Sequence, residues 1–376
     1  MSTATVRRVA FLDLRVPPAE REALVGAVNR VLEHGRIVLG PEVEQLERAV
    51  AERTGRAHGI GVSSGTDACY LALRALGLGP GDEVITTCLS WVATANAIAL
   101  TGATPVFADI RDDLNIDPAS VARLVTPRTR AIMPVHYTGK VCDMDALRAI
   151  ADRHKLDIVE DASQAFDARY RGTIAGGFGT LACFSMNPMK VFAACGEAGM
   201  VVTDRDDLRD RLISLRYNGT INREQCITPS HNGRLDTLQA AMLLVRLPQV
   251  DEIVSRRRVI AGWYSKLLGT SVRTPVTQPW ETDVYYTYQI QTPRRDELKA
   301  FLEARGIETK IQHPILMSQQ PVYTQAGCPT GERLVREILC LPAHEKLEYE
   351  DVEYVAQAVH AFVGNGVGNG VENGAG

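Results

Sequence analysis

Hydrophobic positions follow two patterns that alternate from about residue 55 to residue 245. Short, nearly continuous apolar runs are typical of buried strands, and segments with an apolar residue every three or four positions are typical of amphipathic helices. The alternation predicts an α/β fold, in which a mostly parallel mixed sheet carries helices on both faces. The expected strands are residues 60–64, 83–86, 104–109, 130–135, 156–161, 181–185 and 200–204.

Proline and glycine mark the ends of two helices that precede this sheet. Pro17 and Pro18 come directly before an amphipathic segment that ends near Gly35, and Pro41 opens a second segment that ends at Gly55. Proline fits the first turn of a helix, and glycine readily takes the left-handed conformation that ends one.

The pattern changes after about residue 250. Four segments follow. We expect a basic amphipathic helix in residues 255–268, a strand in 285–293, a helix followed by a second strand in 297–313, and a final helix in 350–363. These elements predict a smaller α+β domain. We therefore expect a large domain over residues 1–250, which includes an N-terminal arm, and a small domain over 251–363. Residues 364–376 have almost no core-forming side chains, which predicts a disordered tail.

Composition narrows the class of protein. The chain has 376 residues, of which 45% are hydrophobic, and 41 basic against 45 acidic residues give a net charge of −4. This balance argues against a nucleic-acid partner. No run approaches the ~18 apolar residues of a membrane span, and the N-terminus lacks a signal sequence. Eight cysteines without a CxxC pair are typical of reduced core thiols in a cytoplasmic protein, without a metal site.

The first candidate site segment is Ser64-Gly65-Thr66-Asp67, where a strand turns into a helix. Glycine permits close approach of a ligand, and the N-terminus of a helix offers free N–H groups, so this turn could bind phosphate. An ordinary helix cap is the alternative. A second alternative uses Gly59, Gly61 and Gly65 as a loose dinucleotide fingerprint, although their spacing differs from GxGxxG.

The second candidate is Asp161 at the end of a predicted strand, with Gln164 three residues later. Ligands of open α/β sheets bind outside the carboxyl ends of the strands. A carboxylate there can pair with the protonated nitrogen of a heteroaromatic ring, and Gln164 can bond a phenolic oxygen on the same ring. The alternative is a helix N-cap with solvated neighbours.

The third candidate is Lys190, which follows the apolar strand that ends at Ser185. A partly desolvated lysine offers an amine for Schiff-base chemistry, whereas most lysines in loops are simply exposed. Trp91, just after another predicted strand, could stack on a cofactor ring or could be an ordinary core aromatic.

These segments, in this order, resemble the pyridoxal-phosphate-dependent sugar aminotransferases of the DegT/DnrJ/EryC1/StrS family. The most specific are SSGTDA, EDASQAF, FSMNPMK with GEAGMVVTD, and NGRLDTLQAAML. The resemblance runs from FLDL near the start to LPAHEKLEYEDVEYV near the end, and so covers nearly the whole chain. It implies the fold type I architecture, pyridoxal 5'-phosphate as cofactor, and a homodimer with active sites at the subunit interface.

The resemblance also implies roles for single residues. Lys190 looks like the lysine that binds the cofactor covalently, Asp161 like the partner of its pyridine nitrogen, and Gln164 like the neighbour of its ring hydroxyl. Trp91 matches the ring-stacking aromatic. The positions that match phosphate-binding residues within the same chain are Gly65, Thr66 and Ser185.

Other positions bear on the partner subunit and the substrate. Asn232 matches a residue that binds the phosphate from the other subunit, and Arg234 matches a contact of the amino donor's carboxylate or of the substrate. His313 is a candidate substrate contact, although many members have tyrosine here, in a His-Tyr-Pro motif that reads Gln-His-Pro in this chain. Two further departures are Asp167 in place of a common glycine and Met189 in place of a small residue.

The function that follows is transfer of an amino group from an amino acid, with L-glutamate as the expected donor, to a keto group at C3 or C4 of a nucleotide-linked deoxy-sugar (dTDP, UDP or GDP). Lys190 favours this reaction over sugar dehydration, because dehydratases of the family carry histidine there. The alternatives are a cyclitol ketone as acceptor, a nicotinamide-dependent oxidoreductase that uses Gly59–Gly65, and a non-catalytic regulator that keeps the cofactor pocket.

Overall fold

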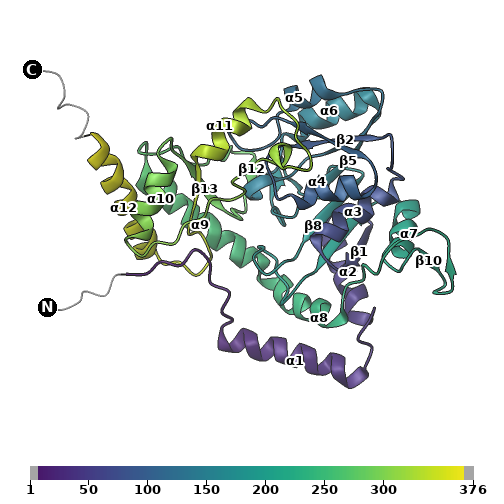
Figure 1. Ribbon diagram of the computed structural model, residues 1–376. Helices are drawn as coiled ribbons and strands as arrows, with labels where there is room; N and C mark the ends of the chain where they lie inside the picture. Colours follow the sequence, from purple (N-terminus) through teal and green to yellow (C-terminus); the bar gives the residue numbers. More distant parts are fainter. Residues whose placement is uncertain (1–6, 368–376) are drawn as a thin grey trace, which may run out of the picture.

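A seven-stranded sheet lies at the centre of the large domain (Figure 1) in the computed structural model, which describes residues 7–367. The strand order is β1-β9-β8-β5-β4-β2-β3, and β9 alone runs antiparallel to its neighbours. The strands expected from the apolar runs are confirmed: β1 (His58–Val62), β2 (Glu83–Thr87), β3 (Thr104–Ala108), β4 (Thr129–Met133), β5 (Asp157–Asp161), β8 (Leu181–Ser185) and β9 (Gly199–Thr203).

Helices cover both faces of this sheet, as predicted. Helices α2, α5, α6 and α8 pack on one face in one apolar cluster, and α3, α4 and α7 pack on the other face in a second cluster. Neighbouring strand residues such as Ile158 and Val159 serve opposite clusters, because successive side chains of a strand point to opposite faces. The helices are α1 (Pro18–His34), α2 (Pro41–Thr54), α3 (Gly65–Ala75), α4 (Ala93–Leu100), α5 (Pro118–Leu124), α6 (Met144–His154), α7 (Asp206–Leu215) and α8 (Thr237–Arg246).

The predicted ends of the first two helices are confirmed. Pro18 and Pro41 occupy the first turns of α1 and α2. Gly35 and Gly55 end these helices with φ of 70° and 69°, a left-handed conformation that glycine adopts without a steric penalty. Figure 1 shows α1 at the rim of the molecule, where it packs against α8.

The loose dinucleotide fingerprint is wrong. Gly59 and Gly61 lie inside β1, where a Cβ on Gly59 would overlap the carbonyl of Glu47 and one on Gly61 would be 2.8 Å from Leu235. These two glycines therefore make room for packing inside the protein.

The C-terminal part is a smaller α+β unit on α9 (Figure 1). Its elements are α9 (Val250–Leu268), β12 (Glu281–Thr282), β13 (Tyr288–Gln291), α10 (Arg295–Glu303), α11 (Pro329–Glu337), β14 (Ile338–Leu341) and α12 (Tyr349–Val367). The short elements are β6 (Arg169–Tyr170) and β7 (Thr173–Ile174), which join β12, the hairpin β10 (Thr220–Ile221) and β11 (Gln225–Cys226), and the 3-10 helices Tyr137–Gly139, Leu247–Gln249 and Met317–Gln319.

Two expectations for this part are wrong. The second strand is β14 and does not lie within residues 297–313, where Ile307 and Lys310 form only isolated bridges. All four residues of β14 are buried, so this apolar run pairs with β13 in the core. Helix α12 continues to Val367, so residues 364–367 of the expected tail are helical. The remaining tail residues, 368–376, lie outside the described residues.

The two units share segments that the linear division does not anticipate. Val9, from the N-terminal arm, is buried in the core of the small unit and bridges to Ile307. Conversely, Leu316 and Leu334 of the C-terminal part pack with Cys88 at the end of β2. The division at residue 250 stays a prediction. None of the helices within residues 7–367 is both long and apolar enough to cross a membrane.

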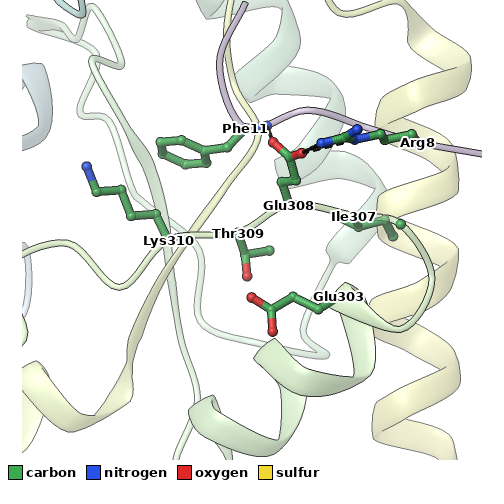
Figure 2. Close-up of a pocket in the computed structure, with 8 residues that line it drawn as sticks. Arg8, Phe11, Glu303, Ile307, Glu308, Thr309 and Lys310 are labelled. Carbon is green, nitrogen blue, oxygen red and sulfur yellow. Dashed lines mark hydrogen bonds and ion pairs between the residues drawn. The ribbon is translucent and has the colours of Figure 1, made fainter.

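The N-terminal arm and the turn after α10 enclose an open cavity of about 590 Å³ (Figure 2). There the carboxylate of Glu308 accepts hydrogen bonds from the Arg8 side chain, at 2.6 Å, and from the Phe11 N–H, at 3.1 Å. The lining of this cavity includes none of the candidate site residues, so the contacts serve to fix the arm on the small unit.

The thiols only partly match the expectation. All eight cysteines are free, and six are buried in the core. Cys195 and Cys226 are exposed, so the interpretation as core thiols is wrong for these two.

A buried polar cluster holds the end of β5. Glu160 is fully buried, and its carboxylate lies 2.9 Å from His136 Nε2 and accepts hydrogen bonds from the N–H groups of Gly176, Phe178 and Gly179. Burial acts to raise the pKa of Glu160, but these partners outweigh it and hold the pKa below its usual value. The carboxylate thereby ties the loop at 176–179 to the strand.

Replacement of this carboxylate should destabilise the fold strongly. In Glu160→Ala, three backbone N–H groups and His136 lose their buried acceptor, and we expect the free energy of unfolding to fall by about 3 kcal/mol or more. Urea denaturation measures the change, with Glu22→Ala on the exposed face of α1 as the control. Equal stabilities of the two variants would contradict the role assigned to Glu160.

Candidate functional site

The turn between β1 and α3 has the form of an anion site. Ser64 caps α3, and its hydroxyl accepts the Asp67 N–H at 3.1 Å. The first N–H groups of a helix have no acceptor inside the helix, which leaves those of Gly65 and Thr66 for a ligand. The interpretation as a helix cap is confirmed, and the phosphate-binding interpretation stays a prediction that the open donors permit.

Close approach of two segments explains the glycine in this turn. A Cβ atom on Gly65 would overlap the Cβ of Ser185, at the end of β8, and one on Gly199 would overlap the Ser64 carbonyl. Gly65 therefore brings the hydroxyl-bearing Ser185 directly against the start of α3. Thr66, beside it, is exposed. The three expected phosphate-binding positions of this chain thus meet in one place.

Asp161 lies at the bottom of the same edge of the sheet. Its side chain is 4% exposed, and its carboxylate accepts hydrogen bonds from the Thr94 hydroxyl at 2.8 Å and the Ser163 N–H at 3.1 Å. No regular helix begins after it, and its neighbours are buried, so the alternative of a solvated helix cap is wrong. Thr94 belongs to the first turn of α4, three residues after Trp91, and links Asp161 to the tryptophan loop.

Gln164 is buried at 5% exposure, one short turn after Asp161. Its side-chain oxygen accepts the Thr138 N–H at 2.9 Å, which leaves its amide N–H groups available as donors. The loop after β4 and the loop after β5 are joined by this bond. Such a donor suits a phenolic oxygen in the position that the resemblance implies.

Lys190 ends a tight turn, in which its N–H donates to the Asn187 carbonyl at 2.8 Å. The side chain is half-buried, and Nζ lies 4.3 Å from the centre of the Tyr286 ring, so it is not an ordinary exposed lysine. A cavity of about 370 Å³ adjoins it, with a wall formed by residues 12–16 of the N-terminal arm. Lys346 holds this wall, because its Nζ donates to the Asp13 carbonyl at 2.9 Å.

Trp91 and His313 lie together near Lys190. Trp91 is 62% exposed, which excludes the interpretation as a core aromatic, and its ring centre is 5.9 Å from that of His313. Burial, and after it the charges of Lys190 and Lys310, lower the pKa of His313 to about 3. The imidazole is therefore neutral at physiological pH.

Asn232 and Arg234 stand apart from this group within the described chain. Asn232 is exposed, and its side-chain oxygen accepts a hydrogen bond from Arg234 at 2.7 Å, while the Arg234 guanidinium lies 4.6 Å from the Tyr217 ring centre. The Gly233 carbonyl accepts the Ser63 N–H, so the segment runs beside the start of α3. Asn232 is thus exposed, and Arg234 is partly exposed.

Sequence reasoning missed several groups around the site. Thr94 follows Trp91 by one helical turn, and Tyr137 follows a predicted strand, so the rule about carboxyl ends of strands could have found both. Tyr286 and Gln289 come from the small unit, and no local pattern announces that they face Lys190 or Tyr137.

Comparison with known proteins agrees with this geometry. The family model described as DegT/DnrJ/EryC1/StrS aminotransferase family matches residues 18–360. The chain belongs to this family. The fold and the aminotransferase class expected from the sequence are thereby confirmed.

Two curated relatives cover almost the whole chain. A dTDP-3-amino-3,4,6-trideoxy-alpha-D-glucose transaminase from Streptomyces venezuelae is 42% identical over 95% of this chain and 97% of its own. A pleiotropic regulatory protein from Geobacillus stearothermophilus is 40% identical over 94% of this chain and 98% of its own.

Two solved structures have the same fold. DesV from S. venezuelae, in complex with a ketimine intermediate, superposes with a TM-score of 0.92 at 42% identity, over 95% of this chain and 98% of its own. The ntda protein from Bacillus subtilis, with bound cofactor PMP, superposes with a TM-score of 0.90 at 29% identity, over 97% of this chain and 87% of its own.

The lowered pKa of His313 predicts a specific acid sensitivity. Below the unfolded value of about 6.5, the unfolded chain binds a proton that folded His313 does not, so the free energy of unfolding falls as pH decreases toward about 3. Because of His313, the free energy of unfolding at pH 5 should be about 2 kcal/mol lower than at pH 7.5. Urea denaturation of the wild type and of His313→Gln at both pH values isolates the contribution of His313 to this pH dependence. An identical loss of unfolding free energy in both proteins would contradict the prediction.

Proposed function

We propose that this protein is a pyridoxal-phosphate-dependent aminotransferase that transfers the amino group of L-glutamate to the C3 keto group of a nucleotide-linked sugar. The proposal is carried by the contacts that connect Asp161 with Lys190. Thr94 donates to buried Asp161 beside the Trp91 loop, and the Trp91 ring lies near His313, on which the charge of Lys190 acts. The open start of α3 lies at the same edge of the sheet. Membership of the aminotransferase family and the named functions of the relatives support it.

The chemistry of the donor set fits pyridoxal phosphate. The N–H groups of Gly65 and Thr66, with the Ser185 hydroxyl, offer donors for a phosphate. Asp161, nine-tenths or more buried, offers a carboxylate to a protonated ring nitrogen, and Gln164 offers an amide N–H to a phenolic oxygen. When bound, the cofactor supplies a carbonyl that reacts with amines and a ring that accepts electron density. The PMP-bound relative supports this assignment.

The residues of this chain would divide the work between them. Lys190 holds the cofactor through its amine and, once displaced by the amino donor, moves a proton at the carbon that bears the amino group. Asp161, fixed by Thr94 and the Ser163 N–H, pairs with the ring nitrogen and keeps it protonated. Trp91, which is 62% exposed and lies near His313, would cover the ring.

The acceptor is assigned from the relatives. The Streptomyces relative is named for a dTDP-linked sugar with an amino group at C3, and further relatives are named for UDP-linked sugars aminated at the same position. We therefore place the new C–N bond at C3. A nucleotide diphosphate is strongly anionic, and Arg234 is the candidate contact for it or for the donor's carboxylate.

A homodimer would complete the site. Asn232 would donate its amide N–H to the phosphate bound by the other subunit, since its own chain leaves it exposed. Large apolar side chains are also exposed on α1 and the loop after it, which is typical of a surface that a partner covers. These residues are Val25, Leu32, Ile37 and Val38, each at least 44% exposed.

Lys190 provides the direct test of the proposed function. We expect the protein with added pyridoxal phosphate to show a visible absorbance band that glutamate bleaches and a keto-sugar restores. Borohydride should fix the cofactor to Lys190, as peptide mapping can verify. Lys190→Ala should slow the amino transfer by about 10²–10⁴-fold, and Lys266→Ala, exposed on α9, should leave it unchanged.

The acceptor panel separates the alternatives. It contains dTDP- and UDP-linked 3-keto and 4-keto sugars and a cyclitol ketone, each with glutamate as donor. Fastest turnover of a 4-keto sugar or of the cyclitol would overturn the assignment to C3. A band that glutamate does not bleach would indicate a regulator, and bound NAD(H) without a band would indicate an oxidoreductase.

Shared active sites predict complementation between two inactive variants. Lys190→Ala protomers retain Asn232, and Asn232→Asp protomers, which place a negative charge beside the phosphate, retain Lys190. After mixed refolding, half of the dimers should contain one intact site, so activity should return to about a quarter of the wild-type value. Lack of any gain over the separate variants would place Asn232 in the site of its own chain.

A further inference from the structure

His313 is held in an unusual way beside Lys190. Its backbone has a φ of 52°, which non-glycine residues rarely adopt, and its ring lies between Trp91 and Tyr137, with ring centres 5.9 and 5.7 Å away. Such a strained position persists only when its surroundings fix it. The contacts of the His313 ring therefore indicate the function of this residue.

Two successive hydrogen bonds connect Gln289, through Tyr137, to the His313 ring. Gln289 Nε2 lies 3.4 Å from the Tyr137 hydroxyl, which lies 3.0 Å from His313 Nδ1. Tyr137 and Gln289 are 1% and 3% exposed, so water does not compete for these bonds. The amide nitrogen donates to the tyrosine oxygen. The buried Tyr137 O–H has no acceptor other than Nδ1 in the described chain, so it donates to Nδ1.

The direction of this chain decides the tautomer of the imidazole. A neutral ring that accepts at Nδ1 carries its proton on Nε2. Burial keeps the Tyr137 phenol protonated, because it raises the pKa of Tyr137, and the same cause keeps His313 neutral. Nε2 has no hydrogen-bond partner in the described chain, so its N–H is available to a ligand beside Trp91.

The lack of charge on this donor points to the kind of group that it binds. Lys190 and Lys310 act on the His313 ring as nearby positive charges, and they are better partners than a neutral imidazole for a carboxylate or a phosphate. An uncharged donor suits a hydroxyl or keto oxygen instead. In the proposed reaction, such oxygens are on the sugar ring of the acceptor.

We propose that Tyr137 and Gln289 are positioning residues that hold His313 as its Nε2–H tautomer, so that it donates a hydrogen bond to an uncharged oxygen of the acceptor sugar. The part that concerns the sugar rests on the proposed function. The part that concerns the tautomer rests only on the hydrogen-bond chain, and it can be tested in the absence of any substrate.

The tautomer is measured by ring ¹⁵N NMR of the holoenzyme labelled with ¹⁵N-histidine. Loss of one signal set in His313→Gln assigns the ring. We expect a protonated Nε2 and an unprotonated Nδ1 in the wild type, and a mixture of tautomers in Tyr137→Phe. Protonation at Nδ1 in the wild type would mean that the hydrogen-bond chain runs in the opposite direction, and would overturn the proposal.

Kinetics of the two half-reactions test the role toward substrate. His313→Phe, which removes the hydrogen bond, should raise KM for the keto-sugar by about fivefold to tenfold. Tyr137→Phe, which leaves a mixture of tautomers, should raise KM by about twofold with kcat unchanged. The half-reaction with glutamate should not change. An effect on glutamate alone would assign His313 to the donor's carboxylate and overturn the proposal.

Three further variants exclude a merely structural effect. Tyr264→Phe is the matched control, because this tyrosine is equally buried and its hydroxyl has no hydrogen-bond partner in the described chain. His313→Gln retains an N–H donor and should keep more activity than His313→Phe. In the His313→Gln background, Tyr137→Phe should have no further effect on KM, and an undiminished effect would overturn the positioning role.

These measurements also separate the two proposals. If no keto-sugar is aminated, the proposed function fails, and the NMR spectrum still confirms or overturns the tautomer. If amination is normal but the tautomer is wrong, only the role of Tyr137 and Gln289 fails.

Discussion

The fold buries two neighbouring carboxylates, Glu160 and Asp161, at the end of one strand, and it must provide hydrogen-bond partners for both. Successive residues of a strand point to opposite faces, so Glu160 and Asp161 face different surroundings. Glu160 is compensated entirely by protein groups, namely His136 and three backbone N–H groups. Asp161 has only a hydroxyl and one N–H, and it retains acceptor capacity for a positively charged partner.

This asymmetry distinguishes the structural carboxylate from the functional one. A buried acid with every bond satisfied is typical of a fold determinant, and one with fewer partners at the edge of a sheet is typical of a binding site. Thr94 extends the same argument to the tryptophan loop, since its hydroxyl orients Asp161 while its helix presents Trp91. The geometry of the proposed cofactor site thus depends on how the protein partners a single carboxylate.

The large sheet and most of the site could be predicted from the sequence, because both depend on local patterns. Buried strands read as apolar runs, and the residues just after them gather at one edge. The missed groups depend on contacts between distant segments. The Tyr286 ring lies against the Lys190 amine, and Gln289 donates to the Tyr137 hydroxyl. Val9 packs in the core of the small unit. The misplaced strand at 307–313 has the same cause, because pairing with β13 is decided by burial in the assembled core. Asp167 now has a physical account: its φ is 73°, where glycine is common and aspartate is tolerated, and Arg53 pairs with its carboxylate.

The N-terminal arm links parts of the molecule that the sequence separates widely. Val9 is anchored in the small unit, the next residues form a wall beside Lys190 under the hold of Lys346, and α1 then packs against α8 of the large unit. This stretch of chain thus crosses from one unit to the other along the cavity that adjoins Lys190. Any change in the relative orientation of the two units would displace it, so the shape of that cavity is mechanically coupled to the arrangement of the units.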